Sequence, residues 1–257
     1  MSIDFDLADG IATITINRPE RMNAMDAEHY RGLSEAWRRV RDDNEIRVAI
    51  VTGAGEKSFS AGADIKSFLT APTGLDEMWL TQKDQLLNRG LEVWKPVIAA
   101  VNGYCLAGGM TLLMATDIRI AAPHATFNIA EVKRGIVPGN GGTQRILEQL
   151  PYPIAMEMLL TGDAIDAATA AQHGLINKIV PMDELMATAR AYAKRIAANA
   201  PLAVQAAKEL AVRARDMDRN TGFRVEALVN RLLQCTEDAR EGPKAFAEKR
   251  PPQFKGA

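Results

Sequence analysis

Two turns built from small residues stand where they could present free backbone N–H groups. The segment "CLAGGMTLLMATDI" places Ala107, Gly108 and Gly109 between an apolar strand end and a helical run, and "FSAGAD" (59–64) forms a second such turn. Small residues let a ligand approach the backbone, and the first N–H groups of a helix lack partners inside it. Two such groups converging from neighbouring strands would bind a carbonyl oxygen, whereas two ordinary strand-to-helix turns would explain the same residues.

A glutamate in the segment "ATFNIAEVKRG" is the candidate for proton transfer. Glu131 follows Phe127, Ile129 and Ala130, and such an apolar setting raises the pKa of a carboxyl group by desolvation. A carboxyl group that titrates near neutral pH suits acid/base catalysis. The alternative, which the residue types alone leave open, is a solvated glutamate in a surface loop.

Other common catalytic patterns fail at identifiable positions. In "VTGAGEKSF" a P-loop would need glycine directly before the lysine, where Glu56 stands, and the dinucleotide fingerprint would need its third glycine at Ser58. No G-x-S-x-G elbow occurs, and three histidines lack zinc-ligand spacing: His29, His124 and His173. We therefore expect neither a metal ion nor a nucleotide cofactor.

The charge balance and the apolar segments limit the expected partners and location. The 257 residues include 31 Lys and Arg against 32 Asp and Glu, which predicts no binding of nucleic acid or of an anionic membrane. The longest apolar stretches contain Pro, Gly and Asn, so we expect no membrane span. The acidic start "MSIDFDLADG" lacks a signal-peptide pattern, and Cys105 and Cys235 lack motif spacing, which favours a cytoplasmic protein with reduced thiols.

Hydrophobic periodicity predicts an α/β core followed by helices. "IATITI" (11–16) alternates like a half-buried strand, whereas "IRVAIVTGAG" and "PVIAAVNG" are apolar runs typical of strands buried on both faces. Strands that alternate with helices, such as the one that Asp26 would cap, indicate βαβ units. We also expect a helix around Asp76–Trp94, a strand at "GLINKIV" (174–180), and helices at Asp183–Asn199, Pro201–Asp216, Thr221–Glu237 and Pro243–Lys249. The predicted division is a core over residues 1–195 and a helical region over 196–257.

Eight ordered motifs along the chain resemble those of the crotonase family, the enoyl-CoA hydratases and isomerases. They are "NRPERMNAM", "FSAGADIK", "KPVIAAVNGYCLAGG", "TDIRIAA", "VPGNGGTQR", "MEMLLTGDAID", "GLINKIV" and "EGPKAFAEKRPPQFKG". The resemblance implies the ββα superhelical core of that α/β fold. It also implies a C-terminal helical region used in trimer formation, commonly with trimers pairing into hexamers.

The same resemblance assigns roles to particular residues. It implies oxyanion-hole N–H groups at Ala63 and Gly108, and a coenzyme A thioester as the substrate rather than as a separate cofactor. It implies a CoA-binding segment made of Ala61, Gly62, Asp64, Ile65 and Lys66 around Ala63, with the lysine as a partner for the CoA phosphates. Phe246 and Lys249 match positions that can reach CoA from an adjacent subunit.

One position departs from the family pattern and bears on the reaction. Typical hydratases carry two glutamates, of which the later is matched by Glu131, while the earlier is replaced by Thr111. The residue before the later glutamate, often proline in the family, is Ala130. A threonine offers one hydroxyl group and no charge, so the usual pair of carboxylates is broken.

The predicted function is therefore an acyl-CoA hydratase or lyase that uses a single glutamate. Water would add to a 2-enoyl-CoA, or leave its product, through a thioester enolate stabilised by the oxyanion hole. The alternatives are an isomerase that converts a 3-enoyl-CoA into a 2-enoyl-CoA, and an acyl-CoA-binding scaffold without catalytic activity. The acyl group stays open, although Met78, Trp79 and Leu80 could border its pocket or simply belong to a packed helix.

Overall fold

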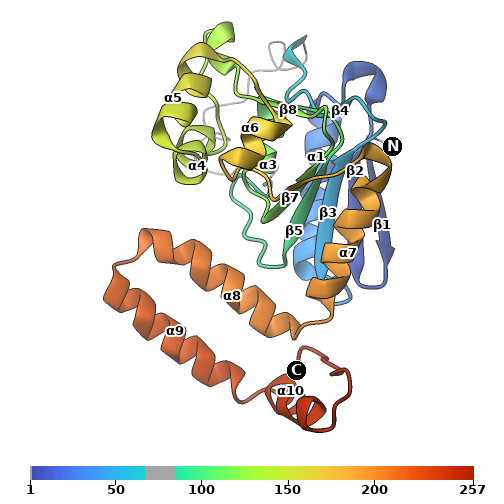
Figure 1. Ribbon diagram of the computed structural model, residues 1–257, viewed down its shortest axis with the longest axis vertical. Coiled ribbons are helices and arrows are strands. Elements are labelled where there is room, and N and C mark those ends of the chain that lie inside the picture. Colours follow the sequence, from blue (N-terminus) through green and yellow to red (C-terminus); the bar gives the residue numbers. More distant parts are fainter. Residues whose placement is uncertain (1, 67–84) are drawn as a thin grey trace.

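Two β-sheets form the core of the protein, and the C-terminal helices extend from it (Figure 1). The computed structural model describes residues 2–66 and 85–257, so Met78, Trp79 and Leu80 lie outside the described residues. The larger sheet has the strand order β1-β2-β3-β5-β7-β10, and the smaller has the order β4-β6-β8-β9. The predicted α/β architecture with C-terminal helices is confirmed.

The larger sheet is buried on both faces because helices cover it from two sides. Its strands are β1 (Ile3–Ala8), β2 (Ile11–Ile16), β3 (Val48–Gly53), β5 (Val97–Val101), β7 (Ile118–Ala121) and β10 (Lys178–Ile179). Within this sheet β1 and β2 pair antiparallel, and the other neighbouring strands pair in parallel. Along β3, Ile50 packs with the side chains of α7 (Leu185–Ala197), while Val51 packs with Trp37 of α1 (Ala27–Asp42) on the other face. The apolar runs of the sequence follow from this double burial.

The smaller sheet collects the ends of three repeated units of the chain. Its strands are β4 (Ser58–Ser60), β6 (Tyr104–Leu106), β8 (Thr126–Asn128) and β9 (Ile165–Asp166). Three times the chain runs from a strand of the larger sheet into one of the smaller sheet: β3 to β4, β5 to β6, and β7 to β8. Because β4, β6 and β8 pair in parallel, the segments that follow them meet at one edge.

Several helices begin where the sequence supplies a capping residue. The Asp26 carboxylate accepts the N–H groups of Glu28 and His29 and so caps α1, as predicted. The helices near the smaller sheet are α3 (Gly108–Leu113), α4 (Gly142–Gln149), α5 (Tyr152–Thr161) and α6 (Ala167–Gln172). Short 3₁₀ turns cover Pro19–Arg21, Glu131–Arg134, Met182–Glu184 and Ala214–Asp216.

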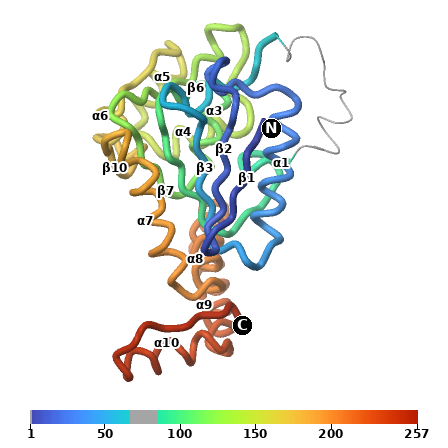
Figure 2. The backbone as a smooth tube through the Cα atoms, turned by 90° about the vertical axis from the view of Figure 1, so that its right-hand side faces the viewer, coloured from blue at the N-terminus to red at the C-terminus, as the bar shows by residue number. Residues whose placement is uncertain are grey.

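The C-terminal helices project from the core (Figures 1 and 2). They are α8 (Pro201–Arg213), α9 (Arg219–Leu233) and α10 (Glu237–Ala247). On α9 the side chains of Phe223, Leu228 and Leu232 are exposed. Within the described part of the chain, no helix combines the length and apolar character needed to cross a membrane.

Three details differ from the predicted elements. The last helix begins at Glu237 rather than Pro243, because the Thr236 hydroxyl caps its first turn and the proline lies inside it. In "GLINKIV" only Lys178–Ile179 is a strand. Leu175 is buried but belongs to the end of α6, where its backbone N–H donates to Ala170 O. The described part of Asp76–Trp94, from residue 85, forms turns and bridges instead of a helix.

Candidate active site

The turns after β4 and β6 lie against each other and leave two backbone N–H groups without partners among the described residues. Met25 N–H donates to Gly62 O at 2.7 Å, and Asp64 N–H donates to Met25 O at 2.8 Å. The hydrogen bonds of this bridge are made by Gly62 and Asp64, on either side of Ala63, and the Ala63 N–H takes no part in them. Among residues 2–66 and 85–257, neither the Ala63 N–H nor the Gly108 N–H donates a hydrogen bond. Two donors of this kind can hold a carbonyl oxygen that gains negative charge.

Glycine is required where the two turns touch. A Cβ atom added at Gly62, whose φ is +86°, would lie 2.6 Å from Gly108 N. A Cβ atom added at Gly109 would lie 2.4 Å from the carbonyl oxygen of Ser60. Any side chain at these two positions would push the turns apart and separate the two N–H groups.

Ala107 holds the start of α3 in a strained conformation. Its φ of 48° and ψ of −117° are unusual for a residue with a Cβ atom, and strain of this kind costs about 1–3 kcal/mol. The conformation is held because Ala107 N–H donates to Asn128 O of β8 at 3.0 Å. This bond fixes the direction in which the following Gly108 N–H points.

Asn23, which the sequence analysis did not single out, ties the first turn to its strand. Its fully buried amide nitrogen donates to Ala54 O at 3.0 Å and to Ser58 O at 2.6 Å. Ser60 Oγ donates to Asn23 O at 2.8 Å and accepts the Gly62 N–H at 3.1 Å. Asn23 lies inside the motif "NRPERMNAM", but nothing local in the sequence indicates these distant partners.

An arginine holds the same turn from the outside. The Arg18 guanidinium lies 3.0 Å from an Asp64 carboxylate oxygen and 3.2 Å from one of Asp26. Asp64 also accepts the Lys66 N–H at 3.1 Å. Of the residues predicted to bind CoA, Asp64 therefore directs its carboxylate at protein groups, whereas Ile65 and Lys66 are exposed.

Glu131 begins the 3₁₀ turn after β8 and so lies at the same edge as the two glycine turns. Its side chain is half-buried, and Oε2 is enclosed without a hydrogen-bond partner within the described part of the chain. Burial raises the pKa of its carboxyl group above the ordinary value, as predicted from the apolar residues before it. A carboxyl group with a raised pKa holds a proton more readily than an exposed one, which suits a group that accepts and returns a proton.

A tyrosine of α1 joins the site without a local sequence signal. The Tyr30 hydroxyl lies 3.5 Å from the position of a Cβ atom at Gly108. Burial raises the pKa of Tyr30 to about 12; the charge of Arg89 lowers that pKa, and the charge of Glu131 raises it further. Tyr30 is therefore a neutral hydroxyl group near both Gly108 and Glu131.

Thr111 lies on α3 with its hydroxyl group fully engaged. The hydroxyl donates to Gly108 O at 3.0 Å and accepts a hydrogen bond from Asn88 Nδ2 at 3.2 Å. Both side chains are buried, and Asn88 Oδ1 has no hydrogen-bond partner among the described residues. Asn88 also was not singled out from the sequence, because its partner lies 23 residues further along the chain.

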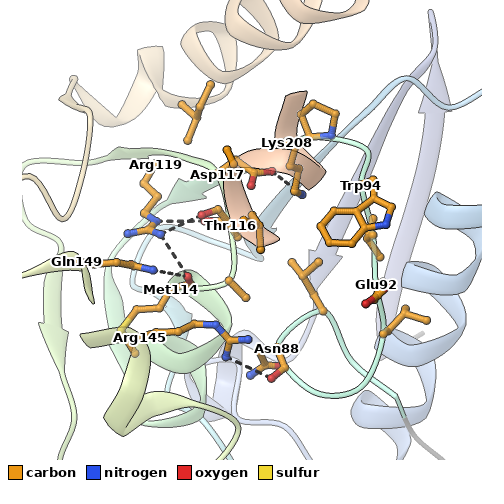
Figure 3. A pocket seen from close by; sticks show the side chains of 18 of the residues that line it. Asn88, Glu92, Trp94, Met114, Thr116, Asp117, Arg119, Arg145, Gln149 and Lys208 are labelled. Atoms are coloured by element: carbon orange, nitrogen blue, oxygen red, sulfur yellow. Dashed lines mark hydrogen bonds and ion pairs between the residues drawn. The ribbon is translucent and has the colours of Figure 1, made fainter. Parts of the chain in front are cut away.

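Asn88 lines two cavities of very different size. The smaller, of about 10 Å³, is also lined by Tyr30, Gly108 and Asn140. The larger, of about 940 Å³, lies among the segment that contains Asn88, α4 and α8, as seen in Figure 3. Arg145, which lines the large cavity, donates hydrogen bonds to Asn88 O at 3.3 Å and to Asn140 O at 2.7 Å. It thereby holds the backbone of two residues that line the small cavity.

The two C-terminal residues predicted to contact CoA lie elsewhere. Phe246 is 86% exposed on α10, and Lys249 follows that helix. Figures 1 and 2 both place α10 at the end of the molecule away from the smaller sheet. A single chain therefore does not bring Phe246 and Lys249 to the turns that carry Ala63 and Gly108.

The chain is similar to known proteins over its whole length. Residues 6–257 match the family model described as enoyl-CoA hydratase/isomerase. The (E)-benzylidenesuccinyl-CoA hydratase of Thauera aromatica is 42% identical over 100% of both chains. The carnitinyl-CoA dehydratase of Salmonella arizonae is 42% identical, with 96% of this chain and 95% of the relative covered.

A solved structure shows the same fold. The crystal structure of an enoyl-CoA hydratase from Mycobacterium tuberculosis superimposes with a TM-score of 0.91 at 39% identity, covering 100% of this chain and 99% of the other. Together, the full-length family match, the relatives and the shared fold establish that the chain belongs to the crotonase (enoyl-CoA hydratase/isomerase) family and is an enzyme of the hydratase or dehydratase type that acts on acyl-CoA thioesters.

Proposed function

We propose that this enzyme adds water to the double bond of a 2-enoyl-CoA, and removes it in reverse, with Glu131 as its single acid/base. The observation that carries the proposal is the buried Oε2 of Glu131, at the sheet edge that also holds the Ala63 and Gly108 N–H groups; none of the three has a hydrogen-bond partner in the described part of the chain. Within residues 2–66 and 85–257 no protein group hydrogen-bonds to these three atoms, so each can meet the substrate.

The reaction follows from that arrangement. The oxygen of water bonds to C3 of the enoyl group while Glu131 takes one proton from the water. The electron pair of the double bond moves toward the thioester, whose oxygen becomes negatively charged and is held by the Ala63 and Gly108 N–H groups. Glu131 then returns a proton to C2, and the enolate collapses to the 3-hydroxyacyl thioester. Loss of one such N–H donor typically slows a reaction of this kind about 10²- to 10³-fold.

An isomerase is the second candidate, and one observation favours it. Thr111 supplies no charge, and moving a proton between C4 and C2 of an acyl chain needs only one base. The same N–H groups and Glu131 would serve both reactions. An acyl-CoA-binding scaffold without activity is less well supported, because it gives no reason to keep an unpartnered carboxylate buried.

The CoA part of the substrate would lie along the first turn. Ile65 and Lys66 are exposed beyond Ala63, where the lysine can meet a phosphate group. Phe246 and Lys249 would reach CoA from an adjacent subunit of a trimer or a pair of trimers, built from the C-terminal region 196–257 on the core 1–195. Sedimentation of the purified protein tests the assembly, and Phe246→Ala should raise KM without lowering kcat.

The acyl group is proposed from the relatives and the large cavity. The relatives named above act on benzylidenesuccinyl-CoA and carnitinyl-CoA, and a cavity of about 940 Å³ beyond Asn88 has room for a bulky acyl group. A panel should therefore contain these thioesters beside short and long 2-enoyl-CoA and 3-enoyl-CoA substrates.

The test is a mass-spectrometric screen of this panel in heavy-oxygen water. A hydratase incorporates one heavy oxygen atom into the product, whereas an isomerase converts a 3-enoyl-CoA without incorporating any. Glu131→Gln is the matched control, since it keeps the shape of the side chain and removes the base. Binding of the thioesters without turnover of any of them would instead support the scaffold.

A further inference from the structure

Two buried oxygen atoms of the site lack hydrogen-bond partners within the described part of the chain. One is Oε2 of Glu131 and the other is Oδ1 of Asn88. Tyr30 lies near both residues. It lines the small cavity with Asn88 and Gly108, and the charge of Glu131 acts on its hydroxyl group. Buried polar atoms in folded proteins nearly always have a partner, which is often a bound water molecule.

The orientation of the Asn88 amide is fixed by Thr111. The single hydroxyl hydrogen of Thr111 is donated to Gly108 O, so the hydroxyl oxygen can only accept from Asn88. Nδ2 of the amide must therefore face Thr111, and Oδ1 must face away from it. Exchanging the two amide atoms would set the Oδ1 acceptor against a hydroxyl oxygen with no hydrogen left to give.

The small cavity has the size of one water molecule. Its volume of about 10 Å³ lies at the lower limit for holding water. Polar groups of Asn88, Asn140, Tyr30 and the Gly108 backbone line it together with four apolar side chains, those of Met25, Leu33, Leu86 and Leu112. A water molecule has two hydrogens to donate, and an added nucleophile must keep one lone pair free. Two acceptors on one side of the water would meet that requirement.

We propose that Asn88 binds the water molecule that adds to the substrate, with Oδ1 accepting one O–H hydrogen bond while Glu131 accepts the other. The inference rests on the proposed hydration. An amide oxygen does not take up a proton near neutral pH, so Asn88 only orients the water. Glu131 removes the proton, the water oxygen bonds to C3, and the proton from Glu131 reaches C2, which balances the reaction without any further reactant.

Thr111 acts through Asn88 as a positioning residue. It does not replace a carboxylate at its own position, because both functions of its hydroxyl group are used within the protein. Instead it turns the amide so that an uncharged oxygen faces the site. The second polar group of the reaction thus comes from a different segment of the chain than α3.

The experiment separates water addition from enolate chemistry. Hydration is followed by heavy-oxygen incorporation with a 2-enoyl-CoA that the wild type hydrates. Enolate formation is followed by exchange of the C2 protons of the corresponding saturated acyl-CoA in D₂O, which needs Glu131 and the N–H groups but no added water. Asn88→Ala should lower kcat for hydration about 10²-fold, the usual effect of a misplaced reactant, and leave the exchange rate unchanged.

Three further variants complete the test. Thr111→Val should also lower kcat for hydration, but less than Asn88→Ala does. Thr111→Ser, which keeps the hydroxyl group, should hydrate like the wild type. Asn44→Ala is the matched control, because Asn44 is exposed in the turn that follows α1 and lines neither cavity. It should change neither readout.

Each outcome decides the matter. If Asn88→Ala keeps full hydration, or if hydration and exchange fall together, the water-binding role is overturned and Asn88 has at most a structural one. If the wild type exchanges C2 protons but hydrates no thioester, the proposed hydration fails first, and Asn88 has no water to bind. Exchange that persists while hydration is lost in Asn88→Ala supports the inference.

Discussion

The site has a backbone half and a side-chain half, and they are built differently. The backbone half consists of two turns packed so closely that a methyl group added at Gly109 would lie 2.4 Å from Ser60 O. The side-chain half consists of Glu131 and Asn88, which each keep a buried oxygen without a partner in the described residues, and Asn88 also lines cavities of about 10 and 940 Å³. The first half can serve any reaction through a thioester enolate, so the second must determine which reaction occurs.

Removing the base should have the largest effect, and it should lower both hydration and C2 proton exchange. Glu131→Gln keeps the packing of the side chain but cannot accept a proton, so kcat should fall about 10²- to 10⁴-fold. The loss should appear equally in hydration and in C2 proton exchange, measured as described above. Full retention of either activity would remove Glu131 from the mechanism.

Displacing the backbone half should come next. Gly109→Ala forces a contact with Ser60 O, shifts the Gly108 N–H, and should cost about 10²- to 10³-fold in kcat for every thioester substrate alike, as loss of one donor does. Gly222→Ala is the control, because a Cβ atom there, in α9, meets nothing within 4 Å. That control should keep full activity and raise the unfolding temperature slightly. A loss restricted to hydration would contradict the division into two halves.

The pH dependence tests the side-chain half alone. Burial raises the pKa of Glu131 above its ordinary 4.5, so kcat/KM should rise with pH along a limb that lies above this value and is absent in Glu131→Gln. Stability should show the opposite trend. A raised pKa means that the folded protein binds this proton more tightly than the unfolded chain, so its stabilisation is complete below the unfolded pKa and is lost as pH rises through the folded pKa.

Urea unfolding of wild type and Glu131→Gln across that range measures the trend. The free energy of unfolding of the wild type, relative to the variant, should decrease from pH 4.5 upward. A difference that does not change with pH would mean that Glu131 is solvated in the folded protein.

The ion pairs that support the first turn should give the smallest effect. Arg18→Gln removes the contacts with Asp26 and Asp64, which are partly exposed, and should lower activity only a few-fold, since such pairs contribute roughly 0–1 kcal/mol. Arg41→Gln, which breaks an exposed pair with Asp42, should change nothing. Steady-state kinetics of both variants decide this, and equal activity of the two would show that the turn needs no outside support.

Local sequence was sufficient to place Ala63, Gly108 and Glu131 in segments that follow strands, whereas their proposed roles rest on the resemblance to the family. These residues stand two or three positions after the ends of β4, β6 and β8, so their neighbours in sequence also define much of their surroundings. Tyr30 and Asn88 could not be predicted in this way, because they reach the site from α1 and from an irregular segment. The predictions at Leu175 and Pro243 were wrong for a related reason. Leu175 was expected in a strand but lies at the end of α6, and Pro243 was expected to begin a helix but lies inside α10.

Ala107 has a consequence for repeated turnover. Its left-handed conformation, with φ at 48°, is held by a hydrogen bond to the neighbouring strand, so the strain is introduced once, when the chain folds. The direction of the next N–H group is then already set before any thioester arrives. Each catalytic cycle can therefore begin without reorganising that donor. The conformational free energy of Ala107 is spent during folding and not again in any turnover.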